Sequence, residues 1–132
     1  MKIIYQPPAP SAYNELRVEG GLSRKSLEAA EIGLSNSLFA VSIYEANTLI
    51  GMGRVVGDGG TVFHVVDIVV KPSHQGRGLG KVIMQEIMDY LDKNTFPGSY
   101  VSLIADEPAN KLYEKFDFQY TYPKSHGMYK MY

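Results

Sequence analysis

The seven residues from Gln75 to Lys81, Gln-Gly-Arg-Gly-Leu-Gly-Lys, have the composition of an anion-binding turn. They follow an apolar stretch typical of a strand and precede an amphipathic stretch typical of a helix. At a helix N-terminus the backbone N–H groups are unpaired and the helix dipole is positive, so such a turn attracts phosphate. Arg77 can add a guanidinium. Lys81 is poorly placed for the dipole, which a bound pyrophosphate would explain.

Two common phosphate-binding motifs do not fit this turn. A P-loop has the spacing G-x-x-x-x-G-K-[ST], but the stretch from Gly76 to Lys81 is one residue too short, and Val82 stands where the hydroxyl should be. A dinucleotide-binding turn needs a glycine where Lys81 lies and an acidic residue at the end of the next strand. The acidic residues that follow lie on the predicted helix itself. Both interpretations are therefore excluded.

The pattern Gln-x-x-Gly-x-Gly after a strand ending Val-Val-Lys-Pro resembles motif A of the GNAT superfamily, the acetyl-CoA-dependent N-acetyltransferases. The resemblance implies that amides of the turn hold the pyrophosphate of coenzyme A. It also implies that pantetheine pairs with free backbone groups of the preceding strand. The cofactor-binding residues implied on this side are Ile68, Val69, Val70, Gln75, Gly76, Arg77, Gly78, Leu79, Gly80 and Lys81.

A second stretch, from Tyr100 to Phe118, resembles motif B of the same superfamily: a strand, a loop and a short helix. The resemblance implies that Tyr113 contacts the cofactor and protonates its sulfur. Asn110 lies three residues earlier on the same helix face, where it either bonds the pantetheine or caps the helix. Asp117 replaces the usual glycine after the helix, and we expect it to adopt the left-handed conformation at a modest steric cost.

The candidates for the general base are His64 and Asp67, the polar residues of the apolar stretch before the turn. Strict alternation places them on opposite faces of a strand, but a bulge between them would turn both toward the acceptor. An unshifted imidazole titrates near neutrality, which suits His64 for the role. Asp67 could attract the substrate ammonium, accept a proton through water or anchor the backbone, and His64 could equally be a core histidine.

Acetyl transfer to an amine requires loss of an ammonium proton, alignment of the reactants, a donor for the oxyanion and a proton for the leaving thiolate. It requires no metal and no covalent enzyme intermediate. The chain has no cysteine, which excludes disulfides, thiolate catalysis and a cysteine zinc site. The expected co-substrate is acetyl-CoA, and the expected acceptor is a primary amine of a small molecule or peptide. The alternative is a non-catalytic acyl-CoA-binding regulatory module.

Residues 1–132 are expected to form a single α/β (α+β) domain. The predicted elements are a strand at 3–5, helices at 11–19 and 23–34, strands at 38–45, 49–56 and 61–71, a helix at 79–93, a strand at 100–105, a helix from Pro108, and a closing hairpin of strands at 118–122 and 127–132. The unit from 61 to 105 must be parallel with a right-handed crossover, whereas hairpin turns join the other strands, so the sheet is mixed. The resemblance adds that the parallel pair is splayed and that helices flank the sheet.

The formal net charge of −1 favours neither nucleic acid nor an acidic membrane as a partner. The N-terminus has no long apolar run, so we expect a cytoplasmic protein. Segments around Ser37 and Ile50 resemble small bacterial members of the superfamily, which often form homodimers. Helical residues around Tyr13, Leu16, Arg17 and Leu22 are expected to line the acceptor site. Arg54 is expected to pair with Asp58, and the late tyrosines to lie on half-buried strands.

Overall fold

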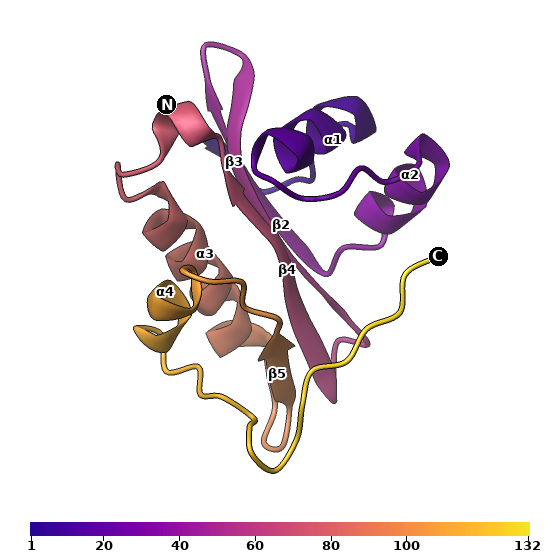
Figure 1. The fold of residues 1–132 in the computed structure, drawn as a ribbon, viewed down its shortest axis with the longest axis vertical. Coiled ribbons are helices and arrows are strands. Elements are labelled where there is room, and N and C mark those ends of the chain that lie inside the picture. Colours follow the sequence, from indigo (N-terminus) through magenta and orange to yellow (C-terminus); the bar gives the residue numbers. More distant parts are fainter.

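The computed structural model describes residues 1–132 and contains one five-stranded sheet in the order β1-β2-β3-β4-β5 (Figure 1). The strands are β1 (Lys2–Ile4), β2 (Phe39–Glu45), β3 (Thr48–Gly57), β4 (Val62–Val70) and β5 (Tyr100–Leu103). Neighbours from β1 to β4 are antiparallel, and β4 pairs with β5 in parallel. The predicted mixed sheet is therefore confirmed.

Helices cover both faces of the sheet. They are α1 (Pro10–Glu19), α2 (Leu27–Ser35), α3 (Leu79–Asn94) and α4 (Asn110–Glu114), with a 3₁₀ turn η1 at Pro72–His74. Figure 1 shows α1 and α2 on one face and α3 with α4 on the other. Each face has its own buried cluster, so the sheet is covered by apolar side chains on both sides. No helix is both long and apolar enough to span a bilayer.

The position of α3 follows directly from its sequence pattern. Its stripe of Leu79, Ile83, Ile87 and Leu91 recurs at helical spacing, and each of these side chains is at most 5% exposed. Opposite this stripe, β3 carries a glycine at position 53. A Cβ there would lie 2.6 Å from Cγ2 of Ile83. Close packing of α3 on the sheet thus holds the N-terminus of the helix at the end of β4.

Strands β4 and β5 separate partway along their length. They pair only from Val62 to Val65 on β4, against Tyr100 to Leu103 on β5, although β4 continues to Val70. A register shift opposite Gly53 marks a bulge on β4, and Asp67 there has a left-handed φ of 58°. The bulge and the separation leave one edge of β4 without a strand partner beyond Val65.

Two helix starts differ from prediction, because Ala9 and Ser26 are the residues that precede the first helical turns. The second helix begins at Leu27, with Ser26 accepting from the Ala29 N–H at 3.0 Å, and not at Ser23. Ser23 is instead held by Arg17, whose Nε donates to its carbonyl at 2.7 Å. The first helix begins at Pro10, one residue earlier than predicted.

The end of the chain departs most from prediction. The last helix begins at Asn110 and not at Pro108, although Asp117 closes it with the expected left-handed φ of 69°. The predicted closing hairpin is wrong, because residues 118–132 contain no strand. The predicted half-burial of the late tyrosines is also wrong, since Tyr120, Tyr122, Tyr129 and Tyr132 are 63–102% exposed. A two-stranded hairpin without further packing is marginally stable, so β-propensity alone does not form one here.

Candidate active site

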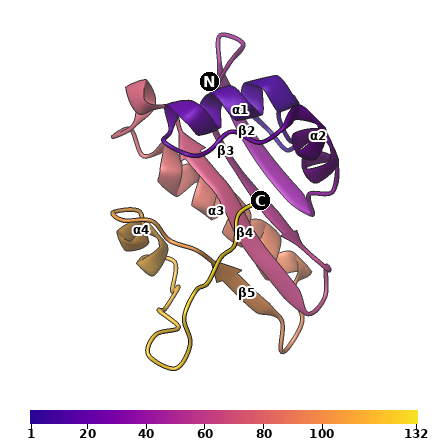
Figure 2. The ribbon, with the colours of Figure 1, turned by 45° about the vertical axis from the view of Figure 1, so that its right-hand side comes forward.

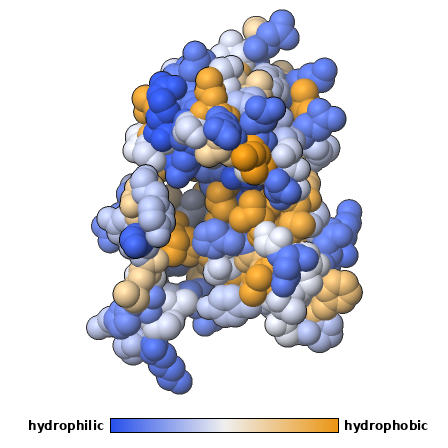
Figure 3. Space-filling model, turned by 90° about the vertical axis from the view of Figure 1, so that its right-hand side faces the viewer, coloured by the Kyte–Doolittle hydropathy of each residue, from blue (hydrophilic) through white to orange (hydrophobic).

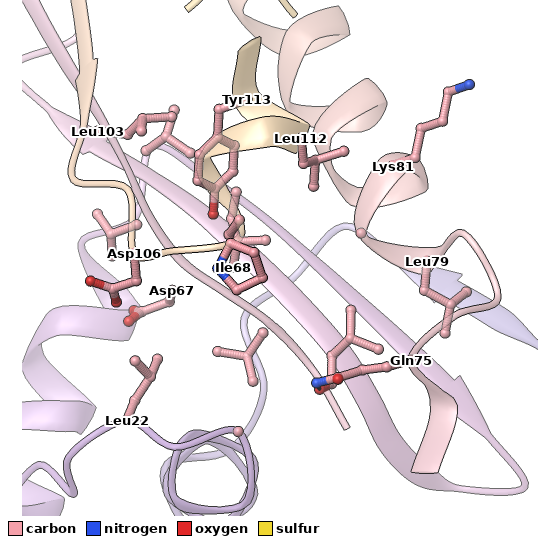
Figure 4. A pocket seen from close by; sticks show the side chains of 18 of the residues that line it. Leu22, Asp67, Ile68, Gln75, Leu79, Lys81, Leu103, Asp106, Leu112 and Tyr113 are labelled. Atoms are coloured by element: carbon pink, nitrogen blue, oxygen red, sulfur yellow. Dashed lines mark hydrogen bonds between the residues drawn. The ribbon is translucent and has the colours of Figure 1, made fainter. Parts of the chain in front are cut away.

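A cavity of about 800 Å³ lies where β4 and β5 separate. It extends from the glycine turn before α3, along β4, to the loop after β5 and to α4 (Figure 4). The face of the molecule in Figure 3 is hollowed, and hydrophobic side chains gather around the hollow. The cavity is lined by all predicted catalytic and cofactor-binding residues except Arg77 and Asn110, namely His64, Asp67, Ile68, Val69, Val70, Gln75, Gly76, Gly78, Leu79, Gly80, Lys81 and Tyr113.

The glycine turn has the geometry of an anion site. Gly76 and Gly78 have φ values of 81° and 80°, which are conformations that glycine adopts without strain, and a Cβ at either would meet no atom within 4 Å. Gly78 directly precedes α3, so the unpaired N–H groups of the first helical turn face the same open space. The Gln75 side chain donates to the Val70 carbonyl at 3.1 Å and ties the turn to the end of β4.

Arg77 lies outside the cavity. Its side chain is 59% exposed, and its nearest acidic partner is Glu45, at 3.9 Å. Glu45 also accepts from His74 Nε2 at 3.1 Å, and this hydrogen bond is the largest cause that lowers the pKa of Glu45. Phosphate binding by Arg77 remains a prediction, because the side chain would have to leave this acidic neighbour.

Tyr113 enters the cavity from α4 and is only 8% exposed. Figure 4 shows its hydroxyl pointing into the space between Asp106 and Ile68. Burial raises the pKa of Tyr113 above its usual value of 10, and the negative charge of Asp106 raises it further. The hydroxyl is therefore protonated at neutral pH and can donate a proton or a hydrogen bond.

His64 lines the cavity from the part of β4 that still pairs with β5. Its Nδ1 lies 3.0 Å from the Ser102 hydroxyl, on the residue directly across the parallel ladder. Ser102 was not predicted, because nothing in the order of residues reveals which side chains face each other across a parallel pair. The contact leaves Nε2 of the imidazole available for a second partner.

Asp67 also lines the cavity, but its carboxylate is held by three other side chains. The Tyr13 hydroxyl donates to Oδ2 at 2.8 Å, Arg17 donates to Oδ1, and Arg54 donates to Oδ2 at 2.9 Å. The Asp67 side chain is 5% exposed and both guanidinium side chains are 9% exposed. Burial and the Asp67 carboxylate raise the pKa of Tyr13. Two buried cations around one carboxylate weaken its attraction for a further ammonium ion.

This cluster corrects the predicted partner of Arg54. The partner is Asp67 and not Asp58, which instead accepts from the N–H groups of Gly60 and Thr61 in the turn between β3 and β4. The same cluster affects the helical residues that were predicted to line the acceptor site. Arg17 lines the cavity while bonded to Asp67, whereas Tyr13 is buried.

Of the other two helical residues predicted to line the acceptor site, Leu22 lines the cavity, whereas Leu16 is buried in the core. Asn110 faces a second cavity, and its amide donates to the Tyr120 hydroxyl at 2.7 Å while its Oδ1 has no partner. Contact of Asn110 with a cofactor therefore stays a prediction. The loop after β5 was missed, although Asp106 and Glu107 from it line the cavity.

The family and the fold are supported by comparison with known proteins. The sequence profile of the acetyltransferase (GNAT) family matches residues 4–118. The structure superposes on that of a protein of unknown function from meticillin-resistant Staphylococcus aureus with a TM-score of 0.96 and 53% identity, over 99% of this chain and 98% of the other. A GNAT-family acetyltransferase from Streptococcus pneumoniae gives a TM-score of 0.79 and 26% identity, over 99% and 97% of the two chains.

Curated relatives match over a smaller share of their length. An uncharacterized N-acetyltransferase of Gracilaria tenuistipitata var. liui is 33% identical over 105 residues, which cover 74% of this chain and 55% of the relative. The glucosamine 6-phosphate N-acetyltransferase of Trypanosoma brucei brucei is 36% identical over 80 residues, covering 51% and 52%. The chain thus spans about half the length of these relatives.

Proposed function

The chain belongs to the acetyltransferase (GNAT) family, and from this premise we propose that it is an enzyme that transfers an acetyl group from acetyl-CoA directly to a primary amine. In this reaction a C–N bond forms as the C–S bond of the thioester breaks. A base takes one proton from the ammonium, and the departing thiolate receives another. The observation that supports the proposal is a single cavity joining the glycine turn, the unpaired edge of β4, Tyr113 and His64.

Acetyl-CoA fits the features that line this cavity. The turn at Gly76 and Gly78 offers backbone N–H groups and open space for the pyrophosphate. The edge of β4 beyond Val65 offers unpaired backbone groups that the amides of an extended pantetheine arm can use. The thioester then lies at the Tyr113 end, where the hydroxyl can protonate the sulfur.

The cofactor assignment predicts that Gly78→Asp lowers the affinity for coenzyme A at least about tenfold, which is about 1.4 kcal/mol. The new carboxylate would face the phosphate, while the added Cβ meets no atom within 4 Å and aspartate tolerates the left-handed φ of 80° at a modest cost. Calorimetric titration measures the change. Gly98→Asp is the matched control, because Gly98 has a similar φ of 89° and equally open surroundings outside the cavity. Undiminished binding by Gly78→Asp would remove the turn from the site.

In our proposal His64 takes the ammonium proton and Ser102 holds the ring by the hydrogen bond to Nδ1. With a saturating amine, the rate should rise with pH on the acidic side of the profile, as the base loses its proton. His64→Gln should abolish this rise and leave a rate that follows the fraction of free amine. The pH profile of kcat measures this, and His126→Gln, outside the cavity, is the control. A His64→Gln profile that overlays the wild type would return His64 to the role of a core histidine.

The amine acceptor is either a small molecule or a peptide, and an experiment can distinguish the two classes. One relative is named for glucosamine 6-phosphate and another, from Glycine max, is named a histone acetyltransferase, so both small-molecule and peptide amines belong in the test. Incubating the protein with acetyl-CoA and a pooled amine library, followed by mass spectrometry, would identify the acetylated product. Acetyl-CoA binding without any product would instead favour the non-catalytic acyl-CoA-binding module. A cytoplasmic location and a homodimer stay predictions.

A further inference from the structure

The charged side chains that line the cavity differ in sign between its two ends. Both lysines belong to the end with the glycine turn. Lys81 lies in the first turn of α3. Lys115 follows Leu112 by three residues and so lies on the same side of α4. Leu112 faces the turn, because a Cβ on Gly80 would be 3.3 Å from its Cδ2. The free positive charge of the cavity therefore lies where an anionic cofactor would bind.

At the other end of the cavity the positive charge is already paired. Arg17 lines the cavity there, but its donors are taken up by the Asp67 carboxylate and by Ser23. Arg54 contacts the same carboxylate, and all three charged side chains are at most 9% exposed. Two guanidinium groups and one carboxylate leave one excess positive charge. None of it is offered as a free hydrogen-bond donor to an acidic acceptor.

The loop between β5 and α4 supplies the unpaired charges of this end. Asp106 and Glu107 both line the cavity, both are exposed, and no ion pair of the chain includes either of them. Figure 2 shows this loop across β4 from α1, and the cavity between them is lined from both sides. In Figure 4, Asp106 and Asp67 lie on one side of the Tyr113 hydroxyl and Lys81 on the other. The two loop carboxylates outweigh the single excess positive charge of the buried cluster, so this end is negative.

The negative charge of Asp106 reaches the atoms that react. After burial, it is the next cause that raises the pKa of Tyr113. The ammonium that is acetylated must lose its proton, however, and a neighbouring carboxylate favours the protonated form. Asp106 would therefore hinder acetylation of a nitrogen that it contacts directly. Its favourable partner is a second cationic group, which keeps its proton throughout the reaction.

We propose that this end of the cavity takes an amine with a second positive charge, such as a linear diamine, and that Asp106 binds the cationic group that does not react. The inference rests on the proposed function, because that function places the thioester beside Tyr113. Glu107 on the same loop adds to the attraction. One ammonium is deprotonated and acetylated, while the other stays paired with Asp106. Acidic and phosphorylated acceptors are disfavoured, because no cation at this end is free to bind them.

Amine binding to the protein saturated with coenzyme A tests this preference without relying on catalysis. Linear diamines from propanediamine to hexanediamine are each compared with the monoamine and the amino carboxylic acid of the same chain length. Calorimetric titration at neutral pH, where both amino groups are protonated, should show at least one diamine binding at least about fivefold more tightly than its monoamine. The amino acids should bind most weakly. Equal affinities for every diamine and its monoamine, or tightest binding of an amino acid, would overturn the proposal.

A substitution of the loop carboxylate tests the residue. Asp106→Asn keeps the shape of the side chain and removes its charge, so the advantage of the diamine over the monoamine should shrink several-fold, and it should disappear when Glu107→Gln is added. Circular dichroism should show native structure, because Asp106 is exposed and makes no ion pair. Asp92→Asn, exposed on α3 outside this cavity, makes the same change in net charge and should keep the full advantage. An unchanged advantage in the Asp106 and Glu107 double variant would overturn the assignment.

Product formation distinguishes this inference from the proposed function. If the chain transfers acetyl groups, mass spectrometry should show one acetyl group on the diamine, and kcat/KM should exceed that of the matched monoamine. Selective binding of a diamine without any acetylated product would contradict acetyl transfer and still support the charge preference. Acetylation of diamines and monoamines with equal kcat/KM would support acetyl transfer and overturn the charge preference.

Discussion

Replacing Tyr113 by phenylalanine should lower turnover about 100-fold while leaving acetyl-CoA binding nearly unchanged. The substitution keeps the buried ring, which is 8% exposed, and removes only the hydroxyl that points into the cavity. General acid catalysis contributes about 10²–10⁴ in rate, and a thiolate is a good enough leaving group to favour the lower end. Steady-state kinetics together with calorimetric titration of acetyl-CoA would measure both parts of this prediction.

The pH dependence follows from the direction of the Tyr113 shift. Its pKa is raised, chiefly by burial, and the acid must be protonated to act, so loss of this proton should lower activity as pH rises through a value above the usual 10. Tyr113→Phe should abolish this alkaline fall along with most of the turnover. Tyr44→Phe makes the same chemical change on β2, outside the cavity, and should behave like the wild type. Wild-type turnover by Tyr113→Phe in an assay limited by chemistry would refute the assignment.

Replacing Asp67 by asparagine should lower the free energy of unfolding by about 3–5 kcal/mol, because it leaves two buried guanidinium groups without their counter-charge. Asparagine tolerates the left-handed conformation as well as aspartate does, so the substitution tests the charge and not the bulge. Urea unfolding measures the difference. Asp92→Asn on the exposed side of α3 is the control and should change stability by less than about 0.5 kcal/mol.

The same variant separates the two roles considered for Asp67. If the carboxylate attracted the substrate ammonium, Asp67→Asn would raise KM for the amine more than it lowered kcat and would leave stability nearly unchanged. The bonds to Tyr13, Arg17 and Arg54 favour a large loss of stability instead. In that case the role of the cluster is structural, because it connects α1 and β3 to the bulge in β4. An increase in KM without a loss of stability would contradict this structural role.

The sequence by itself determined the features whose causes are local. The glycines before α3 are needed because that turn uses left-handed backbone conformations. The stripe from Leu79 to Leu91 has helical periodicity, and a strand–helix–strand unit can only be wound one way. These local constraints were sufficient to predict the mixed sheet and the glycine turn before α3, and the pattern of that turn carried the resemblance to the acetyltransferases.

Only the tertiary structure decided which side chains meet. Asp67 is bonded to Arg17, 50 residues away, and His64 to Ser102, 38 residues away, and neither contact has a signal in local spacing. The prediction of two C-terminal strands was wrong for a related reason. Tyr120 to Tyr132 have the β-propensity of strands, but a strand forms only where another backbone pairs with it, and the one backbone hydrogen bond of this segment is the local one from Ser125 to Thr121.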